Sequence, residues 1–207
     1  MIVYGTSVSP FVRKVLVALA EKGVAYEHRP VAPQAKDLEF RAASPTGKVP
    51  AIEDEGFRLA DSSAILHYIE AVHPEPSLIP SGARDRARAV WFDEYADGEC
   101  FPRMVVPFVE RFLKPRLYKV AGDDALAQRT IDEGFPPLFD YLEGQIDGPY
   151  LVGGAFSIAD IAVASPFHNL RLVKFAPDAE RWPRLAAWVS ATLERPSFVA
   201  AIAAAKA

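Results

Sequence analysis

Cysteine is nearly absent from this chain, because Cys100 is the single cysteine among 207 residues. One cysteine excludes an intrachain disulfide, which is typical of a protein in a reducing compartment. The chain also lacks a charged segment followed by an apolar one at its start, so we expect no signal peptide. Charge or proline interrupts every apolar run before it is long enough to cross a bilayer. These absences together predict a cytoplasmic protein.

Strong charge of one sign and clusters of metal ligands are missing as well. The net charge is −4 and is spread along the chain, so the sequence has no basic footprint for nucleic acid. The four histidines show no metal-ligand spacing, and we expect neither a metal nor a bound cofactor. Half of the residues are apolar and 24% are charged, as in an ordinary globular protein.

The first third of the chain alternates between strand and helix patterns. Strands are expected at 2–4, 26–29, 49–53 and 57–59, and helices at 10–22, 38–43 and 61–72. The order β-α-β-α-β-β-α predicts a mixed sheet with helices packed on it. Segment 73–82 then holds three prolines and reads as a linker.

Beyond this linker the pattern becomes helical and no strand is expected. The helical stretches are 84–113, 124–145, 157–172, 184–194 and 197–206, with Pro102 and Pro107 expected to kink or split the first. Ser157 and Asp160 have the spacing of a capping box, which builds the fold and does no chemistry. We therefore expect an α/β domain at 1–75, a linker at 76–84 and an all-α domain at 85–207.

A hydroxyl group stands where the first strand turns into the first helix, in the segment Ser7-Val8-Ser9-Pro10-Phe11. The start of a helix offers unpaired N–H groups and a partial positive charge, which stabilise an anion such as a thiolate. A lone serine before such a helix usually serves as its N-cap. The catalytic interpretation depends on two further motifs.

These two motifs are Gly47-Lys48-Val49-Pro50-Ala51 and Ala60-Asp61-Ser62-Ser63-Ala64. A cis Val49–Pro50 bond would leave the Val49 backbone free to pair with an extended peptide ligand. Asp61 either caps the helix that follows or meets a ligand ammonium, while Ser62 and the helix start hold a carboxylate. The two roles of Asp61 are compatible.

These motifs, in this order and spacing, resemble the cytosolic glutathione transferases, in particular the bacterial type with a serine in the active site. The resemblance covers the whole chain and includes Phe-Ser-Ile-Ala-Asp at 156–160. It implies a thioredoxin-like N-terminal domain, an all-helical C-terminal domain and a homodimer. It also implies that Val49, Asp61, Ser62 and Lys48 bind glutathione, that Pro50 is cis, and that Lys36 approaches the glycine carboxylate.

Ser9 fills the place that cysteine-type relatives give to a cysteine, which rules out dithiol chemistry there. Ser9 is the first choice for the catalytic hydrogen-bond donor to the glutathione sulfur, because it directly precedes Pro10. Ser7 and Tyr4 are the alternatives. An electrophile site is expected between the domains, with Phe11 facing the residues of the kinked helix, which are Glu99, Cys100, Arg103, Met104 and Pro107. A cysteine such as Cys100 is more often a small buried apolar residue than a reactive thiol, and ordinary helix packing is an equal alternative for the others.

The leading hypothesis is a glutathione transferase of the detoxification type, which activates glutathione as a thiolate for attack on a small hydrophobic electrophile. Glutathione is then a co-substrate, and no cofactor, nucleic acid or membrane is expected as a partner. Two alternatives stay open: a non-catalytic interaction module with the same fold, and a glutathione-dependent isomerase or dehalogenase. The residues do not distinguish the last of these from a conjugating enzyme.

Overall fold

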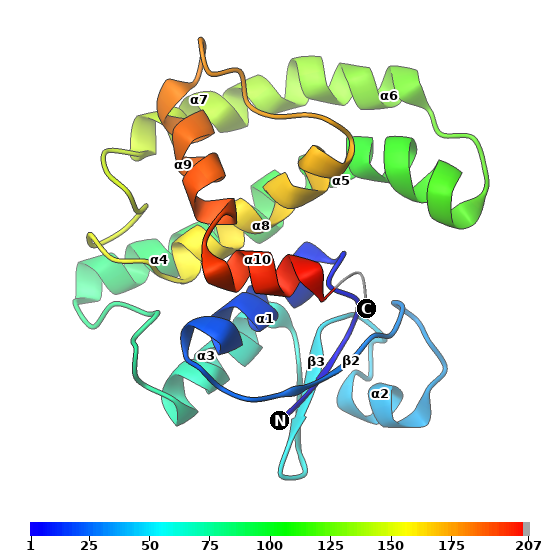
Figure 1. Ribbon diagram of the computed structural model, residues 1–207, viewed down its shortest axis with the longest axis vertical. Helices are drawn as coiled ribbons and strands as arrows, with labels where there is room; N and C mark the ends of the chain where they lie inside the picture. Colours follow the sequence, from blue (N-terminus) through cyan, green and yellow to red (C-terminus); the bar gives the residue numbers. More distant parts are fainter. Residues whose placement is uncertain (205–207) are drawn as a thin grey trace. The chain divides into compact units, whose positions relative to one another are not determined.

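The computed structural model describes residues 1–204 and divides into two compact units (Figure 1). The first unit comprises Met1–Ile79 together with the chain from Glu194 onward, and the second comprises Pro80–Leu193. This division differs from the expected boundaries, because the last helix groups with the α/β part of the chain. The reason is that the last helix packs against the first helix, a contact that the sequence pattern did not reveal.

The sheet of the first unit has the predicted mixed form. Its strands are β1 (Ile2–Tyr4), β2 (Glu27–Arg29), β3 (Ala51–Asp54) and β4 (Phe57–Ala60), in the order β2-β1-β3-β4. β1 runs parallel to β2, as a β-α-β connection requires, and antiparallel to β3, which in turn is antiparallel to β4. Glu55 and Gly56 have positive φ angles and form the tight turn between β3 and β4.

Helices cover both faces of this sheet. Figure 1 shows α1 (Pro10–Glu21) and α3 (Ser62–Val72) on one side and α2 (Leu38–Ala43) on the other. The inner face of α1 is fully buried at Val15, Leu16 and Leu19, which are spaced as one stripe of a helix. The thioredoxin-like part of the fold prediction is confirmed.

The last helix, α10 (Pro196–Ala203), packs on α1 within the first unit. Phe198 is completely buried there. The Glu21 carboxylate accepts hydrogen bonds from the Arg195 guanidinium at 3.0 and 3.1 Å and from the Ser197 hydroxyl at 2.5 Å. An ion pair and a buried phenylalanine therefore connect the first and last helices of the chain. Residues 205 and 206 of the expected last helix lie outside the described residues.

The second unit is helical, and no strand occurs between Pro80 and Leu193, all of which the structure describes. This confirms the all-α prediction. Its elements are α4 (Ala83–Tyr95), η1 (Ala96–Cys100), α5 (Phe101–Phe108), η2 (Val109–Tyr118), α6 (Asp124–Arg129), η3 (Thr130–Gly134), α7 (Phe135–Gln145), α8 (Ile158–Leu172) and α9 (Pro183–Leu193).

Two of the wider π-type segments lie just before a proline, and the third, η2, contains Pro115. Segment η1 ends just before Pro102, and η3 ends just before Pro136. A proline has no N–H and its ring crowds the carbonyl four residues earlier, so the preceding turn widens. The expected interruption of the first long helix thus falls at Pro102, whereas Pro107 lies inside α5.

Helix α8 forms the centre of the second unit and contacts α4, α5 and α9. The predicted capping box is present at its start. The buried Asp160 carboxylate accepts hydrogen bonds from the N–H groups of Leu151 at 2.9 Å and Ser157 at 3.0 Å. Burial raises the pKa of Asp160 to about 6. None of the helices within residues 1–204 has the length and apolar character needed to span a bilayer.

Candidate functional site

The strand register brings the three sequence motifs to one edge of the sheet. Tyr4, the last residue of β1, pairs with Ala51, the first residue of β3. Ala51 in turn pairs with Ala60, the last residue of β4. The loop after β1, the Val49–Pro50 segment before β3 and the Asp61–Ser62 segment after β4 therefore all emerge at the same edge. The antiparallel pairing is the physical cause of this convergence.

The loop after β1 presents two serine hydroxyls. Ser9 is the N-cap of α1, and its Oγ accepts a long hydrogen bond of 3.5 Å from the Val12 N–H. Because Oγ only accepts in this contact, its proton is available to donate to a ligand. Ser7 is buried, and its Oγ has no hydrogen-bond partner within residues 1–204. Both hydroxyls therefore remain candidates, with Ser9 at the helix start.

Arg13 stabilises this loop through hydrogen bonds to its backbone, a role that the sequence analysis missed. Its buried guanidinium donates hydrogen bonds to the carbonyl oxygens of Ser7 at 3.0 Å and Val8 at 3.3 Å. Charge-assisted bonds of this kind fix the carbonyl positions more firmly than neutral ones. In the sequence, the signal that could have identified this role is a basic residue one turn into the helix.

Gly5 allows this loop to lie directly against the Val49 segment. A Cβ atom at Gly5 would come within 2.5 Å of Val12 Cγ2 and 2.9 Å of Val49 Cβ, and its φ is +132°. Both the close approach and the backbone conformation therefore favour glycine. His28 Nε2 lies 2.7 Å from the Gly5 carbonyl oxygen and also fixes the turn.

The Val49–Pro50 bond is cis, as expected. Neither the N–H nor the C=O of Val49 takes part in a hydrogen bond within the described residues, because the β3 ladder starts at Ala51. The Ser44 hydroxyl donates to the Lys48 carbonyl at 2.7 Å and holds the turn before this segment. The Lys48 side chain is exposed. An unpaired backbone at this point suits pairing with an extended peptide.

Asp61 caps α3, and Ser62 is its first residue. One Asp61 carboxylate oxygen accepts hydrogen bonds from the N–H groups of Ser63 at 3.0 Å and Ala64 at 3.1 Å. The φ angle of Asp61 is +85°, an unusual value for a residue with a side chain, and such residues cluster at ligand-binding sites. The capping role expected for Asp61 is therefore present, and its second oxygen accepts none of these capping bonds.

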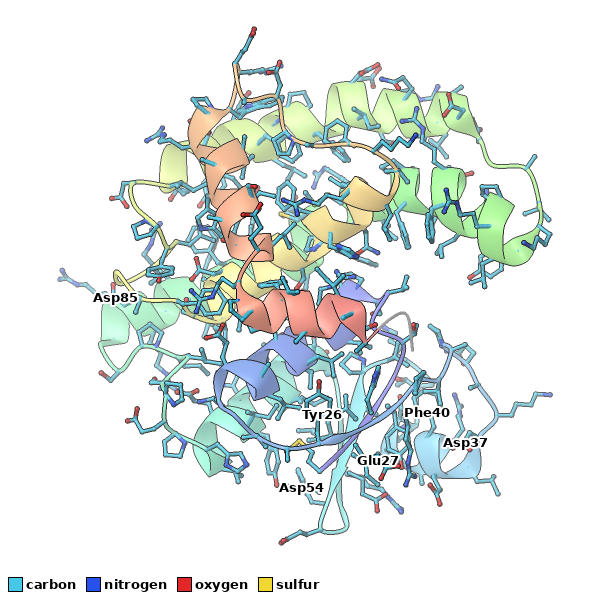
Figure 2. The ribbon with its side chains drawn as sticks, viewed as in Figure 1. Tyr26, Glu27, Asp37, Phe40, Asp54 and Asp85 are labelled. Carbon is cyan, nitrogen blue, oxygen red and sulfur yellow. The ribbon has the colours of Figure 1, made fainter. Side chains whose placement is uncertain are left out.

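The other candidates lie away from this edge or are inaccessible. The Tyr4 ring contacts Phe40 of α2, labelled in Figure 2, and its hydroxyl accepts a hydrogen bond from Arg29 at 3.4 Å. Burial raises the pKa of Tyr4 and leaves only 1% of the residue exposed, so its hydroxyl is poorly accessible to a ligand. Cys100 is completely buried, and this raises the pKa of its thiol far above the usual range. Its predicted role as a small buried apolar residue is confirmed.

Among the residues expected at an electrophile site, Met104 is also buried, and Arg103 is paired with Glu99 at 2.8 Å. That site stays a prediction. Lys36 is exposed in the loop before α2, and its proposed contact with the glycine carboxylate stays a prediction as well.

Comparison with known proteins gives both units a family. Residues 3–77 match the model of the glutathione S-transferase N-terminal domain, and residues 124–191 match that of the C-terminal domain. A glutathione S-transferase of Triticum aestivum is 30% identical over 206 residues, spanning 97% of this chain and 92% of the relative. The maleylacetoacetate isomerase of Dictyostelium discoideum is 28% identical, spanning 91% of this chain and 87% of the relative.

A solved structure supports the same assignment. The crystal structure of a glutathione S-transferase from Rhodospirillum rubrum superimposes with a TM-score of 0.85 at 30% identity, covering 95% of this chain and 89% of that one. Because 95% of this chain is covered, the match extends over both units. The chain therefore belongs to the glutathione S-transferase family of enzymes.

Proposed function

We propose that this protein binds glutathione at the sheet edge formed by residues 5–9, 49–50 and 61–62, and holds its sulfur as a thiolate beside Ser9. The thiolate then attacks a small, mostly apolar electrophile. The observation that carries the proposal is the convergence of three complementary groups at one edge. These are a hydroxyl at the start of α1, the unpaired Val49 backbone and a carboxylate beside the start of α3.

Each group matches one part of the tripeptide. The Val49 N–H and C=O pair with the cysteinyl backbone, in the manner of an added strand. The free oxygen of Asp61 meets the γ-glutamyl ammonium, and Ser62 with the α3 N-terminus holds the carboxylate. Lys48 is exposed and adds a positive charge near the anionic tripeptide. The sulfur then lies near the loop that Arg13 and Gly5 hold in place.

The available interactions suffice to deprotonate the thiol. The pKa of a free thiol is about 8.5, and lowering this pKa by ~2 units requires about 2.7 kcal/mol. A hydrogen bond from a hydroxyl to the thiolate contributes roughly 1.5–3 kcal/mol. The start of α1 adds about 0.3–1 kcal/mol. A single serine at a helix start therefore meets the need without a general base.

Replacement of Ser9 tests this mechanism. Ser9→Ala should raise the pKa of bound glutathione by about 1–2 units and lower turnover at neutral pH roughly 10- to 100-fold, with little change in glutathione affinity. The thiolate absorbance of the complex, titrated against pH, measures the shift directly. Ser7→Ala is the matched control and should leave the titration unchanged. A shift in Ser7→Ala but not in Ser9→Ala would transfer the role to Ser7.

A second candidate function is a glutathione-dependent cis–trans isomerisation. The similarity to the Dictyostelium maleylacetoacetate isomerase favours it, and the same thiolate would add to the double bond and leave again. Assays with maleylacetoacetate and with an aryl halide distinguish the two reactions. Consumption of glutathione indicates conjugation, and turnover without consumption indicates isomerisation.

Absence of any calorimetric heat with millimolar glutathione would favour the non-catalytic interaction module over both enzymes.

We also propose that the protein forms a homodimer. Two exposed aromatic residues support this, because large apolar side chains in aromatic clusters often mark a protein interface. Trp91 is 48% exposed and stacks on Tyr95 with ring centroids 4.9 Å apart. Phe57 is also 48% exposed and contacts Tyr68.

A further inference from the structure

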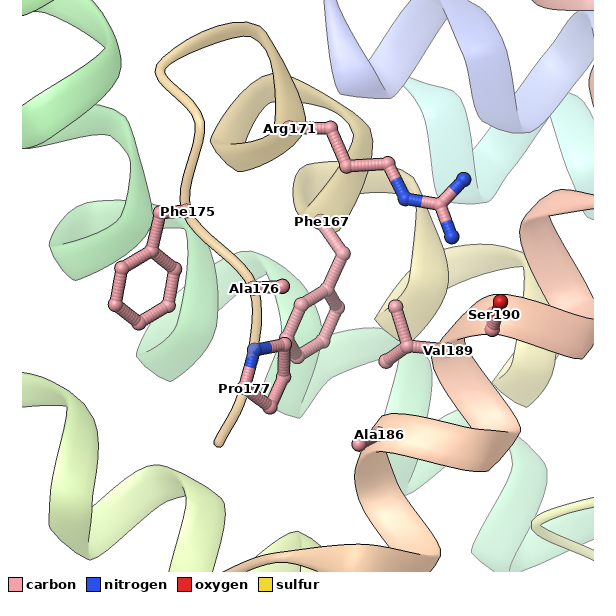
Figure 3. A pocket seen from close by; sticks show the side chains of 8 residues that line it. All are labelled: Phe167, Arg171, Phe175, Ala176, Pro177, Ala186, Val189 and Ser190. Atoms are coloured by element: carbon pink, nitrogen blue, oxygen red, sulfur yellow. The ribbon is translucent and has the colours of Figure 1, made fainter. Parts of the chain in front are cut away.

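The second unit contains a small pocket that the proposed glutathione chemistry does not use. It lies between the end of α8, the loop that follows it and α9 (Figure 3). All its described lining residues belong to the second unit, whereas the proposed glutathione residues belong to the first. The lining residues are Phe167, Arg171, Phe175, Ala176, Pro177, Ala186, Val189 and Ser190.

Local geometry explains why the pocket is present. Phe167 and Arg171 are four residues apart on α8 and so share one face. Lys174 has a φ of +59° and ends α8 with a left-handed turn, in which its N–H donates to the Arg171 carbonyl at 3.0 Å. This turn reverses the chain and brings Ala176 and Pro177 beside α8.

The pocket has an apolar wall of aromatic rings. The Phe167 ring lies between Pro177 and Val189 in Figure 3. It is held by Phe139 at a centroid distance of 5.6 Å, and Phe139 in turn contacts Phe175 at 6.2 Å. These ring contacts fix the wall from behind, so the pocket is formed before a ligand arrives. Preformed apolar walls of this kind bind rings well.

Charge at the pocket is of one sign. Among the described residues that line it, Arg171 is the one with a charged side chain, and it is exposed. Its guanidinium extends above Val189 on the side of Ser190 in Figure 3. No ion pair of Arg171 occurs within residues 1–204, so its planar fork of donors is available to a carboxylate.

The size of the pocket limits what can enter. Its volume is about 170 Å³. A dry cavity of roughly 150 Å³ accommodates one benzene molecule, while sites for drug-sized ligands are roughly 300–1,000 Å³. The pocket therefore accommodates a single ring with a short side chain, and it is too small for a tripeptide conjugate.

We propose that this pocket binds a small monocyclic aromatic carboxylate. The ring packs on Phe167 and Val189, and the carboxylate pairs with the Arg171 guanidinium. This is a second small-molecule site, and it does not depend on the glutathione mechanism.

Calorimetric titration with phenylacetate tests the proposal. We expect a dissociation constant on the order of 0.1–1 mM, as for a ligand with about ten heavy atoms. Phenylacetamide has the same shape without the charge and should bind about 10- to 100-fold more weakly. Arg171→Gln should show the same loss for phenylacetate. Its matched control is Arg184→Gln, an exposed arginine of the same unit that pairs with Glu143 and does not line the pocket.

A second variant tests the volume of the pocket separately from its charge. Ala186→Phe fills the pocket from α9 and should abolish phenylacetate binding while the far-ultraviolet circular dichroism stays native. Glutathione affinity, measured on the same samples, should be unchanged in both variants. The proposal is overturned if wild-type protein shows no saturable phenylacetate binding, or if binding survives both Arg171→Gln and Ala186→Phe. Displacement of phenylacetate by saturating glutathione would also overturn it, by moving the ligand to the glutathione site.

Discussion

Individual residues at the sheet edge each have a structural task beside their proposed chemical one. Ser9 and Asp61 are both helix caps, and Gly5 is the point where two loops touch. A substitution at such a position changes stability and ligand binding together. The experiments at this scale must therefore separate the two effects.

Asp61→Asn separates capping from charge. Asparagine is an equally good N-cap and tolerates a positive φ, so the free energy of unfolding should change by less than about 0.5 kcal/mol. Loss of the carboxylate should weaken glutathione binding by about 10-fold or more, because the ammonium loses its charged partner. Calorimetry and urea unfolding measure the two quantities. In Asp61→Ala both should fall, with about 1 kcal/mol lost in stability. Unchanged glutathione affinity in Asp61→Asn would remove Asp61 from the site.

Gly5→Ala should destabilise the protein by about 1–3 kcal/mol, because the added Cβ overlaps Val12 and Val49 and the φ of +132° is strained for alanine. Chemical denaturation measures the loss. Gly148→Ala is the matched control, since Gly148 is exposed, lies outside the helices and strands, and a Cβ there meets no atom within 4 Å; it should change stability by less than about 0.5 kcal/mol. Equal effects in the two variants would contradict the close approach at Gly5.

At the scale of single elements, caps and prolines decide where the helices of the second unit begin and change pitch. Ser157 and Asp160 fix the start of α8, and Pro102 and Pro136 each follow a widened turn. The residue types of these signals are visible in the sequence. Burial is what only the folded structure reveals, and it raises the pKa of the Asp160 carboxyl although the hydrogen bonds of the cap lower it.

Asp160 should make stability depend on pH in an unusual direction. Its pKa is raised to about 6 from an ordinary 3.8, so the folded state takes up the proton more readily than the unfolded state. The contribution of Asp160 to the free energy of unfolding is therefore fully present below about pH 4 and is lost as the pH rises through about 6. Relative to Asp160→Asn, wild-type stability should fall by up to about 3 kcal/mol between these values. Urea unfolding of both proteins across this range measures the difference. A difference that grows with pH would show that the hydrogen bonds outweigh burial.

At the scale of the whole molecule, the ends of the chain meet in one unit. Helix α10 packs on α1 through Phe198 and the Glu21–Arg195 pair, although 174 residues separate that pair. The first unit is thus completed by the last segment of the chain.

The proposed homodimer belongs to this scale. Light scattering after size exclusion should give about twice the chain mass of 22.7 kDa. Trp91→Glu should shift the protein toward the monomer, because a charge placed in an apolar interface is costly to bury. Leu117→Glu, at a residue 64% exposed outside the aromatic cluster, should leave the mass unchanged. A monomeric wild-type protein would contradict the proposal.

The sequence by itself determined the type and order of the elements, because strand and helix periodicities and the Ser157–Asp160 cap are local signals. It also identified the three motifs, since each has its own turn residues. Only the tertiary structure decided that Tyr4, Ala51 and Ala60 are neighbours in register, which places the motifs at one edge. It likewise decided the role of Arg13, the grouping of α10 with α1 and the Arg171 pocket. These features depend on contacts between residues far apart in the chain, and periodicity within one segment carries no information about them.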